Sequence, residues 1–190
     1  VMVQGFGLFL GVLLYFFLSA VDVGELSKKW KWLLGFNVVF ILLLRSPFGL
    51  ARGGNRAWLG VNDIGERLGV KFLEDFPITV QPAEIVKITF IILLARQLAL
   101  LSEKRDLTRL ANVIQPTAHA GLMFLFYYVI SKDAGSGLVY LFVFVCMAFA
   151  AGFALRWIFL GVGGAVGGFL AAWNLNLLRG DWYGRIKVIL

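Results

Sequence analysis

Glu84 and Lys87 carry opposite charges inside an apolar stretch, QPAEIVKITFIILLARQL, at residues 81–98. Their spacing of three residues places both side chains on one face of a helix. An unpaired charge at bilayer depth costs from about 3 to more than 10 kcal/mol, so such side chains face a partner, a bundle interior or a water-filled cavity. Two interpretations follow. The two residues form an ion pair that neutralises itself near the membrane surface, or they line a polar cavity in which Lys87 binds an anionic substrate and Glu84 orients it.

Three further polar or aromatic residues are candidates for a site. Asp133 lies in SKDAGSGL, a short polar break between two apolar runs, where it is either the N-cap of the following helix or a carboxylate held near Glu84 and Lys87. Trp58 follows GGNRA in a long connector, and tryptophans are common anchors at a membrane interface. His119 stands alone in its apolar segment, which favours a hydrogen-bonded structural histidine over a proton relay.

The elements that must position these residues are membrane-spanning helices. The chain has 190 residues, of which 60% are hydrophobic and 15% charged. A bilayer core about 30 Å thick takes roughly 20 apolar residues as a helix. Phe and Leu occur without the period-two alternation of a lipid-facing barrel strand. We therefore predict an all-α polytopic membrane protein, a single membrane domain with six spans at about 1–20, 32–50, 79–101, 112–131, 136–155 and 157–178.

The connector after the second predicted span is unusually long, and we assign residues 51–78 to a loop on one membrane face. Connectors of this length are functional or disordered, and the apolar residues of this one, among them Trp58, argue against disorder. Lys and Arg occur in nearly equal numbers on the two predicted faces, so their distribution does not orient the spans.

Composition excludes several function classes. The protein has a formal net charge of +7, and its basic residues lie between the predicted spans. At that place anionic headgroups or an anionic substrate are better partners than nucleic acid. Cys146 is the only cysteine, which excludes an intramolecular disulfide or a cysteine metal cluster and predicts a small core residue. GVGGAVGG at 161–168 lies in an apolar span without a preceding strand, so it predicts close helix packing rather than a dinucleotide site.

Three motifs resemble those of one family. QPAEIVKI is similar to the Q-P-[SA]-E-x-x-K segment of the SEDS proteins (shape, elongation, division and sporulation), which include RodA, FtsW and SpoVE. GGNRAWLGV resembles the family's G-x-[KR]-x-W-[IL] loop, and KDAGSGLV resembles its D-[LM]-G-[ST]-[AG]-L segment. The motifs occur in the family's order over nearly the whole chain. Family members have about ten spans, so the resemblance implies that this chain holds the second to the seventh.

The resemblance also implies a function in cell wall synthesis for cell shape, division or sporulation. It implies a peptidoglycan glycosyltransferase of the bacterial plasma membrane that polymerises lipid II, with undecaprenyl pyrophosphate as leaving group. A class B penicillin-binding protein would be the transpeptidase partner. No cofactor is expected in this chain, although a divalent metal ion could accompany the pyrophosphate. The Trp58 loop and Asp133 would lie outside the cell, and membrane lipids, not nucleic acid, would surround the protein.

The site residues carried over from the family are supporting or substrate-binding ones: Gln81, Glu84, Lys87, Asp133 and Trp58, with Arg56 or Arg185 as added positive charge. The family's proposed catalytic aspartate lies in a loop that RGDWYGRIKVIL only begins, and Asp181 does not match it. We therefore expect the catalytic residue after Leu190 and this piece to be inactive alone. Lys132 replaces the proline or acidic residue that often precedes the aspartate at position 133.

Two rival functions remain from the sequence. A flippase for the same lipid-linked precursor would use the same charges to shelter a headgroup while it crosses the membrane. An unrelated secondary transporter would predict an inverted repeat between halves, and none is visible.

Overall fold

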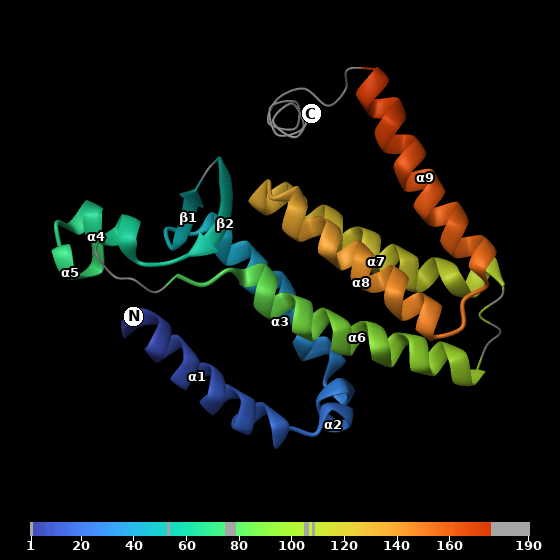
Figure 1. Ribbon diagram of the computed structural model, residues 1–190, viewed down its shortest axis with the longest axis horizontal. Helices are drawn as coiled ribbons and strands as arrows, with labels where there is room; N and C mark the ends of the chain where they lie inside the picture. Colours follow the sequence, from blue (N-terminus) through green and yellow to red (C-terminus); the bar gives the residue numbers. More distant parts are fainter. Residues whose placement is uncertain (1, 53, 75–78, 105–106, 108, 176–190) are drawn as a thin grey trace.

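The computed structural model describes residues 2–52, 54–74, 79–104, 107 and 109–175, and Figure 1 shows its elements. Asp181, Arg185 and the end of the last predicted span therefore lie outside the described residues. In chain order the elements are α1 (Met2–Ser19), α2 (Val23–Lys28), α3 (Trp30–Leu42), the 3-10 turn η1 (Leu43–Arg45), β1 (Gly49–Arg52), β2 (Asn55–Leu59), α4 (Asn62–Leu68), α5 (Lys71–Glu74), α6 (Pro82–Lys104), α7 (Leu110–Ser131), α8 (Ala134–Ala150) and α9 (Leu155–Asn174).

A helix of 13 to 23 residues overlaps each of the six predicted span ranges. Among the described residues, two helical segments are long and apolar enough to cross a membrane, Pro82–Glu103 and Leu110–Ser131. Gly7–Ser19, Ala134–Ala150 and Leu155–Gly168 are apolar but shorter. Membrane crossing by the remaining helices stays a prediction.

The second predicted range differs from the observed helix. Helix α3 ends at Leu42, and the chain passes through η1 into the strand β1. Pro47 has no backbone N–H and disfavours helical geometry in the residue before it, so the helix cannot continue there. The Ser46 hydroxyl donates to the carbonyl of Leu43 at 2.6 Å and accepts from the backbone N–H of Phe48 at 3.2 Å, which stabilises the turn.

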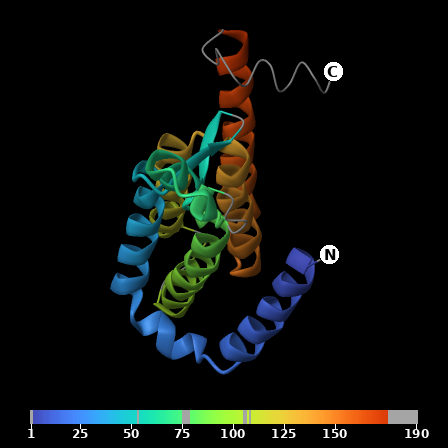
Figure 2. The ribbon, with the colours of Figure 1, turned by 90° about the vertical axis from the view of Figure 1, so that its left-hand side faces the viewer.

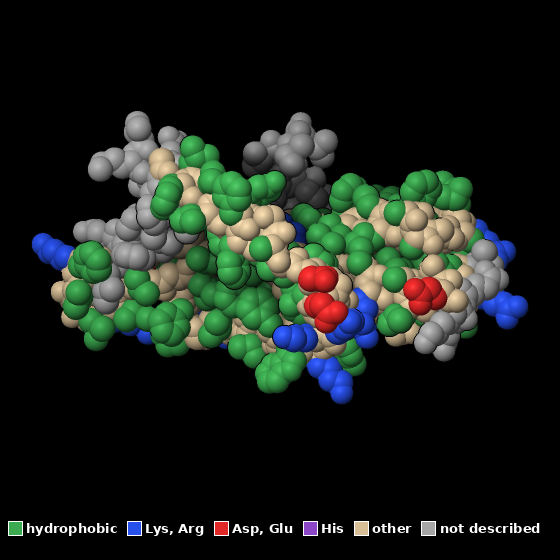
Figure 3. Space-filling model, turned by 90° about the horizontal axis from the view of Figure 1, so that it is seen from below, with side chains coloured by type: hydrophobic (Ala, Val, Ile, Leu, Met, Phe, Trp, Pro, Cys, Tyr) green, Lys and Arg blue, Asp and Glu red, His purple; other side chains and the backbone are tan. Residues whose placement is uncertain are grey.

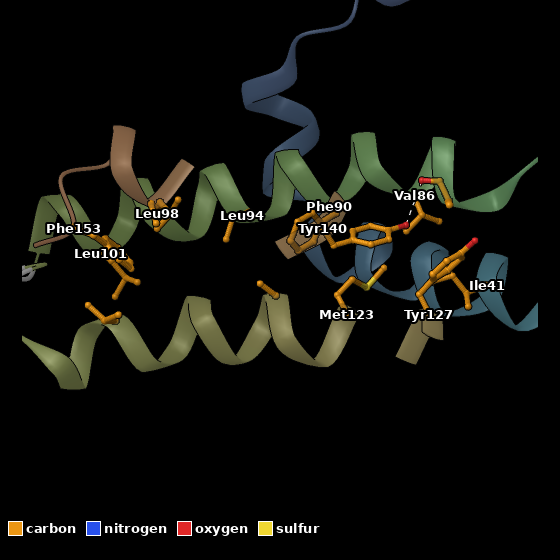
Figure 4. Packing of buried hydrophobic residues seen from close by; sticks show 14 of the residues in the cluster. Ile41, Val86, Phe90, Leu94, Leu98, Leu101, Met123, Tyr127, Tyr140 and Phe153 are labelled. Carbon is orange, nitrogen blue, oxygen red and sulfur yellow. Dashed lines mark hydrogen bonds between the residues drawn. The ribbon is translucent and has the colours of Figure 1, made fainter. Parts of the chain in front are cut away.

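Helix α6 forms the centre of the molecule and packs against α3, α7 and α8. Its buried side recurs at helical spacing and consists of Ala83, Val86, Phe90, Leu94, Leu98 and Leu101. Tyr140 of α8 contacts this stripe, with its ring centroid 5.3 Å from that of Phe90 (Figure 4). Burial of this stripe fixes which face of α6 remains for polar side chains.

The predicted loop 51–78 contains regular structure in its described part, so the all-α expectation holds for the long elements but not for this connector. Strands β1 and β2 form an antiparallel hairpin in which Leu50 pairs with Trp58. Gly54 has a φ of 84°, a conformation that glycine adopts at the tip of a hairpin without strain. Two backbone hydrogen bonds of 2.7 and 2.8 Å then join Leu59 to Val80, directly before α6.

Helices α1 and α9 extend away from the central helices, as the two views in Figures 1 and 2 show. A Cβ atom added at Gly163, Gly164, Gly167 or Gly168 would meet nothing within 4 Å among the described residues. Close packing of this glycine face therefore stays a prediction. The prediction for Cys146 is wrong, because its side chain is exposed on the outer face of α8 rather than in the core.

Candidate functional site

The first two turns of α6 carry the charged pair. Lys87 Nζ lies 2.8 Å from Glu84 Oε1, and the helical spacing of three residues brings the two together. The Lys87 side chain is 19% exposed, whereas that of Glu84 is 60% exposed. The lysine is therefore the more enclosed partner of the pair.

Asp133 and Gln81 are joined through a serine. The Gln81 Nε2 group donates to Ser136 Oγ at 3.0 Å, and the Ser136 hydroxyl donates to Asp133 Oδ2 at 2.6 Å. The backbone N–H of Ser136 also donates to Asp133 Oδ1 at 3.4 Å, so Asp133 is the N-cap of α8. The N-cap prediction for Asp133 is confirmed, and this residue is also tied to the start of α6 through Ser136. A position of Asp133 near Glu84 and Lys87 stays a prediction.

Two buried tyrosines, Tyr127 and Tyr140, lie near the hydrogen bonds that join Gln81, Ser136 and Asp133. The Tyr140 hydroxyl donates to the carbonyl of Ala83 at 3.2 Å and so links α8 to the first turn of α6. The Tyr127 hydroxyl is buried near Gln81 and Ser136, and it has no hydrogen-bond partner among the described residues. Neither tyrosine was predicted from the sequence, since both lie in apolar runs. Ser136 could have been found, because it stands at the capping distance of three residues from Asp133.

The hairpin holds Trp58 and Arg56 beside the start of α6. Trp58 is half-buried in β2, and the Arg52 guanidinium carbon lies 5.8 Å from its ring centroid. Arg56 donates from Nε to the carbonyl of Gly49 at 3.1 Å and from Nη2 to the carbonyl of Ser46 at 3.2 Å. Both bonds stay within the hairpin region, so Arg56 stabilises the loop that leads to Gln81. Its use as a phosphate ligand stays a prediction.

His119 lies apart from this site. Its Nδ1 is 3.0 Å from Gln97 Oε1, a contact between α7 and α6 that agrees with the structural role favoured by the sequence. In the described cavities that border α6, the α6 residues of the lining begin at position 93, so a cavity around Glu84 and Lys87 stays a prediction. Among the described residues, no group of three or more His, Cys, Asp or Glu side chains could hold a metal ion.

The arrangement combines an enclosed ammonium group with two carboxylates and a hydroxyl at one end of the helix bundle. An ammonium held by a neighbouring carboxylate can bind an anionic group, and carboxylates can accept hydrogen bonds from sugar hydroxyls. The chemistry suits a polar, anionic ligand that reaches the bundle at the level of the hairpin.

Comparison with known proteins yields related sequences. The chain is 29% identical over 164 residues to the stage V sporulation protein E of Bacillus subtilis (strain 168), an alignment that covers 83% of this chain and 39% of that protein. This chain thus spans well under half of the curated relative it matches.

Solved structures share the fold. A chain from a peptidoglycan synthase complex, studied for the structural coordination of polymerization and crosslinking, superposes with a TM-score of 0.69 at 27% identity, covering 98% of this chain and 48% of that one. The rod shape determining protein RodA of Thermus thermophilus superposes with a TM-score of 0.63 at 25% identity, covering 85% of this chain and 47% of that one.

A family model completes the comparison. The model of the FtsW, RodA and SpoVE cell cycle proteins matches residues 1–189, nearly the whole chain. The motifs around Trp58, Lys87 and Asp133, which pointed to this family in the sequence, are the segments that the fold brings to one end of the bundle. The chain belongs to the FtsW, RodA and SpoVE family of cell cycle proteins, membrane proteins of the SEDS group.

Proposed function

We propose that the protein is part of a peptidoglycan glycosyltransferase that polymerises lipid II, and that the start of α6 with Asp133 forms one wall of its substrate site. The observation that carries the proposal is the hydrogen-bonded connection from Gln81 through Ser136 to Asp133, beside the Glu84–Lys87 pair. It joins two motifs from distant parts of the chain. A purely local role for each motif would not require that connection.

Glycosyl transfer of this kind needs a base for the acceptor hydroxyl and positive charge for the departing pyrophosphate. Lys87 supplies the positive charge, and Glu84 holds its ammonium group in place at 2.8 Å. Asp133 completes the polar wall through Ser136. A carboxylate serves as the base, and a divalent ion would be carried by the pyrophosphate. Arg56 acts indirectly, by stabilising the hairpin next to Gln81.

The same proposal implies an orientation of the protein in the membrane and a partner protein. The hairpin and Asp133 face outward from the cell, because the lipid-linked substrate is consumed there. The partner is a class B penicillin-binding protein, and the similarity to a chain from a complex that coordinates polymerization and crosslinking supports this choice.

The test uses the full-length protein with its partner and purified lipid II. Lys87→Ala should lower the rate of glycan synthesis by roughly 100-fold, the usual effect of removing one charge-stabilising group. Lys28→Ala is the matched control, because Lys28 forms an exposed pair of the same spacing with Glu25. Normal glycan synthesis by the Lys87 variant would overturn the role given to this residue.

A flippase for lipid II is the alternative function, since the same charges could shelter a headgroup. Liposomes that contain the full-length protein and lipid II distinguish the two. Polymer formation without lipid II scrambling supports the polymerase, whereas scrambling without polymer supports the flippase.

A further inference from the structure

A second polar region lies further along α6. A cavity of about 360 Å³ opens between α3, α6 and α7, a volume within the range of about 300 to 1,000 Å³ common for small-molecule sites. Leu93, Arg96, Gln97 and Leu100 contribute one continuous face of α6 to it. Arg96 stands twelve residues after Glu84, a rise of roughly 18 Å along the helix. The cavity is therefore distinct from the site at the start of α6.

The cavity has an apolar part and a polar part. Trp30 and Leu34 of α3 lie opposite the leucines of α6, while Gln115 and His119 of α7 lie on the polar side. His119 and Gln97 bind each other at 3.0 Å. The lining therefore suits a molecule with an apolar portion and a hydrogen-bonding portion.

Arg96 is the charged residue of the lining, and its side chain is half-buried. Its guanidinium forms neither an ion pair nor a hydrogen bond with any residue that the structure describes. A partly buried guanidinium in an apolar wall gains most from a planar anion such as a phosphate or carboxylate, which it binds with two parallel hydrogen bonds. The start of α6 differs, because Lys87 already has its carboxylate there.

The mouth of the cavity lies at a helix end rich in interfacial residues. Trp30 is the first residue of α3 and is 41% exposed, and the Lys31 ammonium lies 5.6 Å from its ring centroid. Figure 3 shows basic and acidic side chains gathered around α2, with hydrophobic surface on either side. Tryptophans and lysines in this arrangement mark the level of lipid headgroups and attract anionic ones.

We propose that this cavity binds an anionic phospholipid. Arg96 binds the phosphate, Gln97 and Gln115 bind the glycerol or ester oxygens, and an acyl chain lies along Leu34, Leu93 and Leu100. Charge complementarity selects this occupant: an apolar helix would leave Arg96 without an anion, and a free phosphate would leave the leucines uncovered. The inference goes beyond the proposed polymerase, because it concerns a bulk membrane lipid at a separate place on α6.

The test measures retention of phosphatidylglycerol against phosphatidylcholine by the full-length protein in detergent, using native mass spectrometry. Arg96→Gln should weaken retention of phosphatidylglycerol by roughly tenfold, the value of one charge-assisted interaction. Retention of phosphatidylcholine should fall less, because its choline cation already partly neutralises the phosphate. Arg156→Gln is the matched control. It should change the retention of phosphatidylglycerol by less than about twofold, because an exposed arginine outside the cavity attracts an anionic lipid only weakly.

A second variant keeps the proposal testable if the Arg96→Gln variant fails to fold. Leu34→Trp narrows the cavity without changing its charge and should also lower phosphatidylglycerol retention. Equal retention of the two lipids by the unchanged protein, or equal losses in the Arg96 and Arg156 variants, would overturn the proposal. So would full retention in the Leu34 variant.

Discussion

Helix α2 and the junction between α6 and α8 carry the same side-chain types in two different settings. In α2, Asp22 caps the helix by accepting from the N–H groups of Gly24 and Glu25 at 2.7 and 3.1 Å. Glu25 pairs with Lys28 at a spacing of three residues, and both side chains are 66% exposed. The Ser27 hydroxyl donates to the carbonyl of Gly24 at 2.7 Å. Every one of these bonds stays within a single short helix.

At the junction the same types come from two distant segments. Asp133 caps α8, Glu84 pairs with Lys87 on α6, and Ser136 binds both Asp133 and Gln81, which lies 55 residues before it in the sequence. Lys87 is 19% exposed, far less than Lys28. A local arrangement with open surroundings stabilises a surface helix. At the junction, tertiary contacts tie Gln81 to Asp133 through Ser136, and Lys87 is enclosed beside the carboxylate of Glu84, as a binding site needs.

The largest effect should come from exchanging the charges of the α6 pair. Glu84→Lys combined with Lys87→Glu keeps an ion pair but reverses its polarity, so an anionic substrate would meet a carboxylate where it needs an ammonium. Glycan synthesis by the full-length protein should fall by roughly 100-fold or more.

The same exchange in α2, Glu25→Lys with Lys28→Glu, is the matched control. Both exchanges place a lysine in the first turn of a helix, which costs about 0.3–1 kcal/mol in each case. Glycan synthesis should be unchanged in the α2 variant. Normal activity of the α6 variant would mean that its ion pair is only structural, and the contrast between the two regions would fail.

A smaller effect is expected when the serines are removed. Ser136→Ala leaves the Gln81 amide without its acceptor and removes the hydroxyl donor to Asp133, so the free energy of unfolding should fall by about 1–3 kcal/mol. Ser27→Ala should change it by less than about 0.5 kcal/mol, because water replaces an exposed hydroxyl. Equilibrium unfolding in detergent micelles measures both. Equal values would show that the tertiary connection adds no stability.

The smallest effect should follow from neutralising the two caps. Asn caps a helix about as well as Asp, so Asp133→Asn and Asp22→Asn should each change the free energy of unfolding by less than about 0.5 kcal/mol. Glycan synthesis should decrease roughly five- to tenfold for Asp133→Asn alone, because a hydrogen bond to a neutral group is weaker than one to a carboxylate. Unchanged activity would reduce Asp133 to a helix cap.

Much of the architecture was predictable from hydropathy. Long apolar runs must form helices in a bilayer, since lipid offers no partner for backbone N–H and carbonyl groups. The ranges around α6 and α7 illustrate this. The hairpin was not predictable, because its strands are four and five residues long and depend on pairing with each other and with Val80. Short strands carry little signal outside their tertiary context.

Within the site, too, some features follow from the sequence alone and others from the tertiary structure. The sequence by itself determined the Glu84–Lys87 pair and the cap at Asp133, because both depend on spacings of three residues within one helix. Only the tertiary structure decided that Ser136 binds Gln81, that Tyr140 reaches the carbonyl of Ala83, and that Arg96 borders a cavity. These relations depend on how helices pack, which is set by the sum of many weak side-chain contacts and leaves no local pattern to read.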